Sequence, residues 1–485
     1  METIHVKTVD PLSQDLLRGA SKSGLALNWE RYEKQQPQDG FLRLGLSCPY
    51  GCMQGPCRID PFGRGAERGI CGLNRDGMAA AFLLRLALQG VLETMHAYQP
   101  DHQATEIAWP AALDRKTAAV SAMYGGAPLS TREIFESALL LARPDASPDA
   151  LVRQAVRLCL LGISLMERRR IDISRRSMEF RAGYGLLAGE AILIGVTGQI
   201  PQADVHALLT ETAGLKNHET RLITLGDWIP AGNDYLPIAC TTGEAETVLS
   251  VDRINLLLAG RGTDPGILAL CGKMNVPVIL ASENTGTVAI MKYARESFDR
   301  RIPVSFAPDA SLIGKGRVSI GDNEVKAVLQ DGSGAKFALI GGVDTLQQSL
   351  GYLPVELAKA LRGEGHAVAS WGDAAIWMVK QDMPVGLLDA EEGPLTAVRA
   401  MAAAGRLSDI KGICFTGLRN CREFALALGL AALGLKVSVA TPLPLWGSEK
   451  VRGLLRETLA AAGGGLSHFD HPARAEEILD WFVES

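Results

Sequence analysis

The residues of this sequence that could do chemistry are four cysteines in one short segment. Cys48, Cys52, Cys57 and Cys71 are separated by three, four and thirteen other residues. Thiolates are the usual ligands of cubane iron–sulfur clusters, and the glycines between them would let one loop wrap a cluster. Zinc in a closed four-cysteine site is an alternative, and unrelated buried thiols are another. Zinc ribbons favour paired CxxC knuckles, which this segment lacks, so the spacing favours a [4Fe–4S] cluster.

The composition restricts the class of protein. The chain has 485 residues, 47% of them hydrophobic, and a formal net charge of −5. It can bury sizeable cores, but it lacks the basic footprint that binding to nucleic acid or to an anionic membrane requires. Nine cysteines are too few for a disulfide scaffold of this length. The N-terminal residues lack a secretory pattern, and no uninterrupted apolar run reaches about eighteen residues, which predicts a cytoplasmic protein.

Two kinds of segment must position these cysteines and any second site. Residues 39–77 form a Gly-, Cys- and Pro-rich loop, and residues 77–95, 131–143 and 148–166 repeat apolar residues at helical spacing. From residue 190 onward, short apolar runs end in glycine and are followed by helical segments, as in parallel α/β structure. We predict an α/β fold with an N-terminal helical, cluster-binding domain over 1–185. Two Rossmann-like parallel α/β domains follow it, over 186–330 and 331–485.

The cysteine segment also carries a family resemblance. The stretch RYEKQQPQDGFLRLGLSCPYGCMQGPCRIDPFGRGAERGICG, at residues 31–72, resembles the N-terminal cluster-binding region of anaerobic nickel–iron carbon monoxide dehydrogenases, which belong to a superfamily with the hybrid-cluster proteins. By this resemblance, Cys48, Cys52, Cys57 and Cys71 match the internal [4Fe–4S] cubane that relays electrons in each subunit. The first cysteine pair is one residue wider here than the CxxC usual in that family.

The resemblance further implies a homodimer. Members of the family hold a second cubane between two subunits, and its cysteine positions appear here as Asp39 and Ser47. Carboxylate and hydroxyl oxygens are poor substitutes for thiolates on a soft iron–sulfur cluster. We therefore expect the intersubunit cubane to be missing or of altered type.

A weaker similarity continues in the family's order through later segments, among them ILIGVTGQIP, IACTTGE, ASWGDAA and GLRNCREFALALGLA. In the family, these strand-end loops supply a histidine and several cysteines to a nickel–iron–sulfur cluster that interconverts CO and CO2. The matching positions here are Gln199, Cys240, Gly260–Gly262, Gly342, Asp373 and Gly417. At most one or two thiolates remain, so neither nickel nor CO/CO2 interconversion is expected.

The strand-end loops still suggest a site. Open α/β sheets bind ligands at the carboxyl ends of their strands. A second, divergent metal centre there would draw on Cys240, Cys414, Cys421 and Glu244, although free cysteines are often simply buried. Weak catalytic candidates are Arg261, Asp373 and Lys450, and a solvated surface residue is the plainer interpretation of Lys450. Displaced candidates for a proton relay are His96 and His102.

These observations predict an iron–sulfur oxidoreductase of the carbon monoxide dehydrogenase type. Its cubane would relay electrons to or from a divergent site between the α/β domains, with a ferredoxin-like protein as partner and a small-molecule substrate. The alternative is a non-catalytic electron-transfer, sensor or accessory protein with one [4Fe–4S] cluster. A further alternative is a hybrid-cluster-like reductase of small nitrogen compounds, which would need a second, oxygen-bridged cluster.

Overall fold

The fold is taken from a computed structural model of the whole chain. It describes residues 6–36, 38–98, 120–122, 124, 129–168, 177–213, 220–232, 234–281, 286–300, 306, 308–320, 322–330, 336–390 and 393–483. The N-terminal third is helical. Its helices are α1 (Pro11–Lys22), α2 (Asn28–Lys34), α3 (Gly40–Arg43), α4 (Arg75–Tyr98), α6 (Arg132–Leu141) and α7 (Pro148–Arg168).

The next part of the chain alternates strands and helices. Its strands are β1 (Ser177–Ala182), β2 (Ile192–Thr197), β3 (Thr220–Leu225), β4 (Pro230–Ala231), β5 (Asp234–Tyr235), β6 (Ile238–Cys240), β7 (Leu256–Ala259), β8 (Val278–Leu280) and β9 (Gly314–Ser319). Its helices are α8 (Gln202–Ala213), α9 (Ala245–Leu249), α10 (Pro265–Lys273) and α11 (Thr287–Arg300), with 3-10 turns at Tyr184–Leu187 and Thr242–Glu244.

The C-terminal part repeats this alternation. Its strands are β10 (Phe337–Gly341), β11 (Ala367–Ser370), β12 (Gly386–Leu388), β13 (Ile410–Phe415), β14 (Lys436–Val439) and β15 (Gly465–His468). Its helices are α12 (Asp322–Gln330), α13 (Tyr352–Gly363), α14 (Gly372–Lys380), α15 (Gly393–Ala403), α16 (Cys421–Ala432), α17 (Glu449–Ala460) and α18 (Ala475–Val483).

All described strands belong to one sheet, which runs β15-β14-β13-β10-β11-β12-β9-β1-β6-β3-β2-β7-β8, with β5 beside β1 and β4 beside β5. The pairs are parallel except for β1 with β9 and β4 with β5. The predicted α/β class is therefore confirmed. β9 and β1 join the strands of the two predicted α/β segments, and β1 itself comes from the segment predicted to be mostly helical. The domain bounds stay a prediction.

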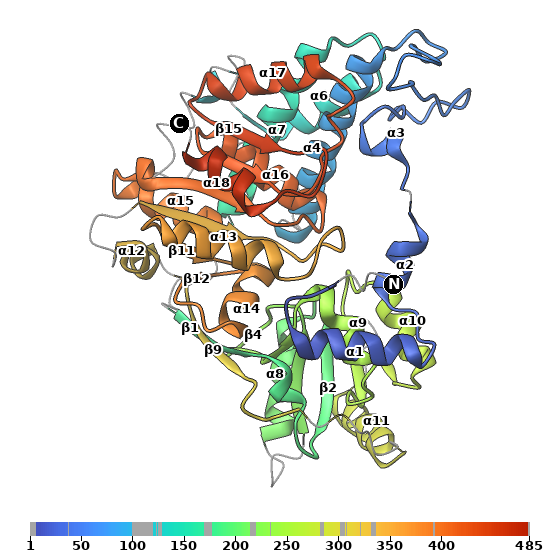
Figure 1. Cartoon of the computed structure of the whole chain (residues 1–485), viewed down its shortest axis with the longest axis vertical. Helices are drawn as coiled ribbons and strands as arrows, with labels where there is room; N and C mark the ends of the chain where they lie inside the picture. Colours follow the sequence, from blue (N-terminus) through green and yellow to red (C-terminus); the bar gives the residue numbers. More distant parts are fainter. Residues whose placement is uncertain are drawn as a thin grey trace.

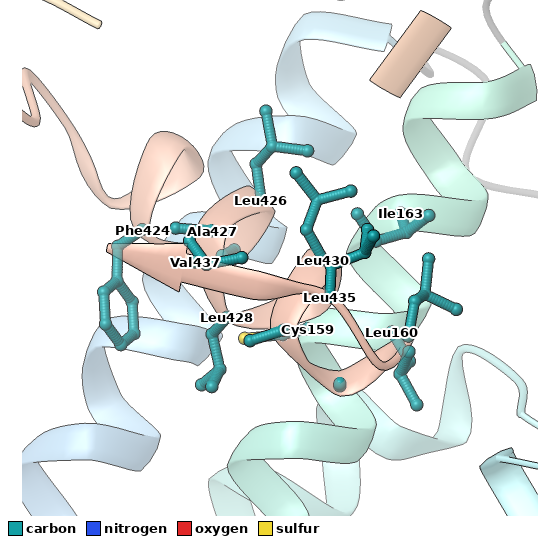
Figure 2. Packing of buried hydrophobic residues seen from close by; sticks show 14 of the residues in the cluster. Cys159, Leu160, Ile163, Phe424, Leu426, Ala427, Leu428, Leu430, Leu435 and Val437 are labelled. Atoms are coloured by element: carbon teal, nitrogen blue, oxygen red, sulfur yellow. The ribbon is translucent and has the colours of Figure 1, made fainter. Parts of the chain in front are cut away.

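The helical part packs on both halves of the sheet (Figure 1). The helices α4, α7 and α16 share the largest buried apolar cluster, while Leu17 of α1 and Trp29 of α2 belong to a cluster with β2 and β7. Figure 2 shows the Cys159 sulfur of α7 beside leucines of α16. Glycines permit these close crossings, since a Cβ at Gly90 of α4 would overlap the backbone of Cys421. Cys159 is thus a packing residue.

One helix in the described part of the chain is long and apolar enough to cross a membrane by length and composition alone. It covers Arg75–Met95, and 56% of its most apolar window is buried inside the protein. Core helices pass the same test, and α4 packs as one against α7 and α16.

Candidate functional site

The cysteine loop begins as a short antiparallel contact. The amide of Cys48 donates to the carbonyl of Cys57 at 2.9 Å, and the amide of Ile59 donates to the carbonyl of Leu46 at 3.0 Å. These two bonds fix Cys48 and Cys57 side by side. A second turn, closed by a bond from the Gly69 amide to the Leu73 carbonyl at 2.8 Å, carries Cys71. The geometry gathers into one loop four thiols that span 24 positions of the sequence.

The electrostatics of Cys48 show that the four thiols are neighbours. Burial raises the pKa of Cys48, and the charges of Cys57, Cys71 and Cys52 raise it further. The raised pKa keeps the Cys48 thiol protonated near neutral pH, and ligation of a metal would deprotonate it.

Backbone amides point at two of the sulfurs. The amide of Gln54 donates to Cys52 Sγ, and that of Ile70 donates to Cys57 Sγ, both at 3.4 Å. Hydrogen bonds to cysteine sulfur are one of the ways in which a protein sets the reduction potential of an iron–sulfur cluster. Cys52 and Cys71 are exposed, whereas Cys48 and Cys57 are half-buried. The donor set and its amide bonds fit an iron–sulfur cluster.

A small apolar cluster packs against the cysteine loop. It consists of Leu46, Ile59, Leu73 and Met78, with Cys48 and Cys57 packed against it. Arg85 of α4 donates to the carbonyl of Pro49 at 2.8 Å and anchors the loop to the helical part. Among the residues that the structure describes, no three His, Cys, Asp or Glu side chains converge on a single metal ion. In a cubane each cysteine binds its own iron, so the cysteines need not meet around one ion.

The strand-end loops of the two α/β halves meet in a second group of polar side chains. Asp373, at the start of α14, accepts hydrogen bonds from the amides of Thr242 at 3.1 Å and Asp344 at 2.9 Å, and from the Thr242 hydroxyl. Burial raises the pKa of Asp373 to about 6, although these hydrogen bonds act in the opposite direction. We call Thr241, Thr242, Asp344 and Asp373 the strand-end junction.

Asp344 is the second carboxylate of the junction. It accepts hydrogen bonds from Trp377 Nε1 at 2.8 Å and from the Thr241 hydroxyl. Burial, and then the charge of Asp373, raise its pKa well above the usual range. Two buried carboxylates this close hold a proton more readily than isolated ones. The junction is therefore a set of hard oxygen groups and not of thiols.

Glu244, predicted as a ligand of a second metal centre, forms a buried ion pair with Lys380. Lys380 Nζ lies 2.9 and 3.1 Å from its two oxygens and 2.7 Å from Asp10 Oδ2, and the Tyr184 hydroxyl donates to Glu244 at 3.0 Å. Burial lowers the pKa of Lys380, but Glu244 and Asp10 outweigh it and raise the pKa overall. This group joins the N-terminal segment to both halves of the sheet.

The comparisons with known proteins agree with this geometry. No family model matches the chain. Carbon monoxide dehydrogenase 1 of Methanosarcina mazei is 49% identical over 89 residues, which are 18% of this chain and 14% of the relative. Carbon monoxide dehydrogenase 1 of Carboxydothermus hydrogenoformans is 47% identical over 83 residues, 17% of this chain and 13% of the relative. This chain is a divergent homologue of the carbon monoxide dehydrogenases. The resemblance predicted from the cysteine segment is thereby confirmed.

Solved structures show that the likeness of fold extends over the whole chain. Carbon monoxide dehydrogenase IV of Carboxydothermus hydrogenoformans superposes with a TM-score of 0.74 at 18% identity and covers 99% of both chains. A nickel-free carbon monoxide dehydrogenase from Thermococcus sp. AM4 gives 0.76 at 17% identity, with 99% of this chain and 97% of that one covered. At such identities the match establishes the fold alone. The curated sequences align over a short segment only, so the activity of those proteins is not carried over with the fold.

Asp39 and Ser47, which the resemblance places where cysteines of a second cubane are expected, have local roles in this structure. Asp39 caps α3, since its Oδ1 accepts hydrogen bonds from the amides of Phe41 at 2.9 Å and Leu42 at 3.2 Å. Ser47 is paired with Arg58 in the antiparallel contact of the cysteine loop. A carboxylate engaged as a helix cap is satisfied by its own backbone.

The cysteines predicted for a second centre lie in different surroundings. Cys240 is fully buried in the cluster beneath β2 and β7, and burial raises its pKa well above the usual range. Cys414 of β13 is buried in a different cluster, together with residues of α13 and α18. Cys421 begins α16, and burial, then Glu93, raise its pKa to about 11. The structure therefore does not gather these three thiols with Glu244, and a shared centre stays a prediction.

The remaining predicted residues are spread over the molecule. Arg261 is exposed, and its backbone pairs with that of Gln199 in a short bridge at the ends of β2 and β7. Lys450 is exposed on α17. His96 belongs to α4, but its side chain lies outside the described residues, as does the whole of His102.

Sequence reasoning missed Asp227, Asp344 and Lys380 near the junction. Lys380 ends α14, and Asp227 accepts bonds from the Thr197 hydroxyl at 2.9 Å and the Gly198 amide at 2.8 Å. Arg419, from the loop after β13, lies 3.5 Å from Asp227 and so links the two halves. Asp227 directly follows Gly226 at a strand end, and Asp344 lies two residues after Gly342 at another, which is the signal that could have found them.

Proposed function

We propose that this homologue is an iron–sulfur oxidoreductase of the carbon monoxide dehydrogenase type. Cys48, Cys52, Cys57 and Cys71 would hold one [4Fe–4S] cluster, which supplies one-electron transfer when bound. The observation that supports this most directly is the loop itself, where the backbone pairs Cys48 with Cys57 and two amides donate to cysteine sulfur. Electrons would pass between the cluster and the strand-end junction.

CO/CO2 interconversion is not part of the proposal. The junction presents the carboxylates of Asp344 and Asp373 and the hydroxyls of Thr241 and Thr242. These are hard oxygen groups, whereas a nickel–iron–sulfur cluster requires soft ligands. A small-molecule substrate at the junction would instead meet hydrogen-bond donors, acceptors and exchangeable protons.

A non-catalytic electron-transfer protein is the second candidate, and a specific observation favours it. Both carboxylates of the junction already accept bonds from within the protein. The cavity beside them, between Gly342, Trp371 and Glu423, has a volume of about 40 Å³. Since a single water needs roughly 10–15 Å³ by this kind of measure, the cavity admits only very small molecules.

The test is the metal content of protein that has been purified and reconstituted without oxygen. We expect about four irons and four sulfides per chain, and an EPR signal of a reduced cubane after dithionite. Cys57→Ser should lose most of the iron, whereas Cys159→Ser, in the apolar core, should keep it. Fewer than about three irons per chain, or one zinc, would refute the cluster assignment.

Two further measurements separate the candidates. An oxidoreductase should show turnover with a viologen dye and a small oxidant that Asp373→Asn abolishes while the iron content stays unchanged. A carrier should exchange electrons with a protein partner at the same rate with or without that substitution. Nickel in the protein, together with dye reduction by CO, would contradict our interpretation of the junction.

The cysteine loop carries exposed apolar side chains, which favour association with another protein chain. Met53, Phe62 and Ile70 are 99%, 79% and 69% exposed beside the cluster cysteines, and apolar residues gathered on a surface commonly mark an interaction site. We include in the proposal a homodimer, a ferredoxin-like electron partner, and a cytoplasmic location where free thiols persist. Light scattering with size exclusion should give the mass of two chains, and Met53→Asp with Ile70→Asp should lower it to one.

A further inference from the structure

A groove of about 540 Å³ lies on the exposed face of β1, β5 and β9, and none of its lining residues belongs to the cysteine loop or the strand-end junction. Its volume falls within the range of small-molecule sites, roughly 300–1,000 Å³. Five of its lining residues are charged: Glu179, Arg181, Asp234, Lys315 and Arg317. None of them was singled out by the sequence pattern.

The groove exists because, among the described residues, no helix covers one face of the sheet at β1 and β9. Along β1, Met178, Phe180 and Ala182 are buried in a cluster with residues of α14, whereas Glu179 and Arg181 are exposed. β1 and β9 are the strands that join the two halves of the sheet (Figure 1). β1 and β9 pair antiparallel, and an antiparallel pair commonly has one face on the core and one face in solvent. The solvent face of this pair forms the floor of the groove.

The register of the strands arranges the charges in two groups. Arg181 pairs directly with Lys315, and Glu179 pairs with Arg317 on one side and with Asp234 on the other. Like charges directly opposite each other destabilise a sheet. In the described part of the chain, Arg181 and Lys315 have no hydrogen-bond or ion-pair partner to offset this repulsion. The groove thus has a cationic end, at Arg181 and Lys315, and an acidic side at Glu179 and Asp234.

Arg317 is already oriented by the protein. Its Nε donates to Ser177 Oγ at 2.8 Å, and Arg317 is one of the residues that line the groove. A guanidinium presents a planar fork that matches carboxylate and phosphate oxygens. Successive exposed residues on a strand are about 6.6–6.8 Å apart, so the cationic end and the acidic side are separated by roughly the length of a small sugar.

We propose that this groove binds a small polyhydroxylated molecule that carries a phosphate or carboxylate group. The oxyanion lies between Arg181 and Lys315, where it relieves their mutual repulsion. The hydroxyl groups of the ligand donate to Glu179 and Asp234. The site lies apart from the cysteine loop, so the proposal does not depend on the cluster assignment.

Calorimetric titration of the full chain tests the proposal, with ribose 5-phosphate and gluconate as the phosphate and carboxylate probes. We expect saturable one-to-one binding of at least one probe that weakens as sodium chloride is raised. Arg181→Gln and Lys315→Gln should each weaken it at least tenfold, whereas Lys359→Gln, on the exposed side of α13, should not. All five charges are on the surface, so circular dichroism should show the variants folded.

Comparing the binding of ribose 5-phosphate with that of inorganic phosphate tests the acidic side of the groove separately from its cationic end. Glu179→Gln should weaken ribose 5-phosphate but leave inorganic phosphate unchanged, because only the sugar reaches the acidic side. The absence of saturable binding for both probes would overturn the proposal. So would binding that survives in Arg181→Gln and Lys315→Gln, or an equal loss in Lys359→Gln, since either result would place the ligand elsewhere.

Discussion

Replacing Lys380 with methionine should destabilise the protein strongly. The ammonium is only 8% exposed, lies 2.7 Å from Asp10 and 2.9 Å from Glu244, and sits 4.3 Å from the centre of the Trp377 ring. Lys380→Met keeps the apolar stem but removes the charge. It leaves Glu244, which is wholly buried, without its counter-ion. Removing one partner of a buried ion pair typically costs about 3–5 kcal/mol.

The expected shift in melting temperature follows from the size of the chain. Unfolding entropy is about 2.1 cal/mol/K per residue, so the 485 residues give roughly 1 kcal/mol/K if the chain unfolds as one unit. The loss then lowers Tm by about 3–5 °C. Tyr184 and Thr241 still donate to Glu244 in the variant, which places the expected value toward the lower end.

Differential scanning calorimetry measures this shift, and a double-mutant cycle identifies its cause. Lys380→Met with Glu244→Gln should recover part of the loss, because the uncompensated charge is then gone. The matched control is Lys359→Met on α13, where the ammonium is exposed and pairs with Glu356 at 2.8 Å, and it should change stability by less than about 0.5 kcal/mol. A Tm for Lys380→Met within one degree of wild type, or a double variant that loses the full sum, would refute the reasoning.

Three further predictions concern stability. Asp373 has a raised pKa of about 6 in the folded protein. Protonation of Asp373 therefore stabilises the folded protein near pH 4, and this stabilisation is lost as the pH rises through 6. The free energy of unfolding of wild type relative to Asp373→Asn should fall over that range by about 1–3 kcal/mol. A constant difference would contradict this. Gly90→Ala should cost about 1–3 kcal/mol in urea unfolding, whereas Gly19→Ala, with open space around it, should be neutral or stabilising. Arg157→Met should cost about 3–5 kcal/mol because it strands the buried Glu133, and recovery with Glu133→Gln is the check.

The sequence by itself determined the features that depend on neighbouring residues. The cysteine loop could be predicted because its four thiols lie within 24 positions, and its glycines and prolines allow the chain to turn between them. The alternation of apolar runs and helical segments predicted the α/β class, since strand and helix periods are local properties. Both predictions depend on the spacing of residues along the chain, which the sequence shows directly.

Only the tertiary structure decided which distant residues meet. Cys240 and Cys414 looked equivalent in the sequence, but β6 directs one into the cluster beneath β2 and β7, and β13 directs the other to the face covered by α13 and α18. Successive residues of a strand face opposite sides of the sheet, and one position decides the side. Asp10, Glu244 and Lys380 come from three separate segments. Their meeting, like the antiparallel pairing of β1 with β9, depends on long-range packing that no local pattern encodes.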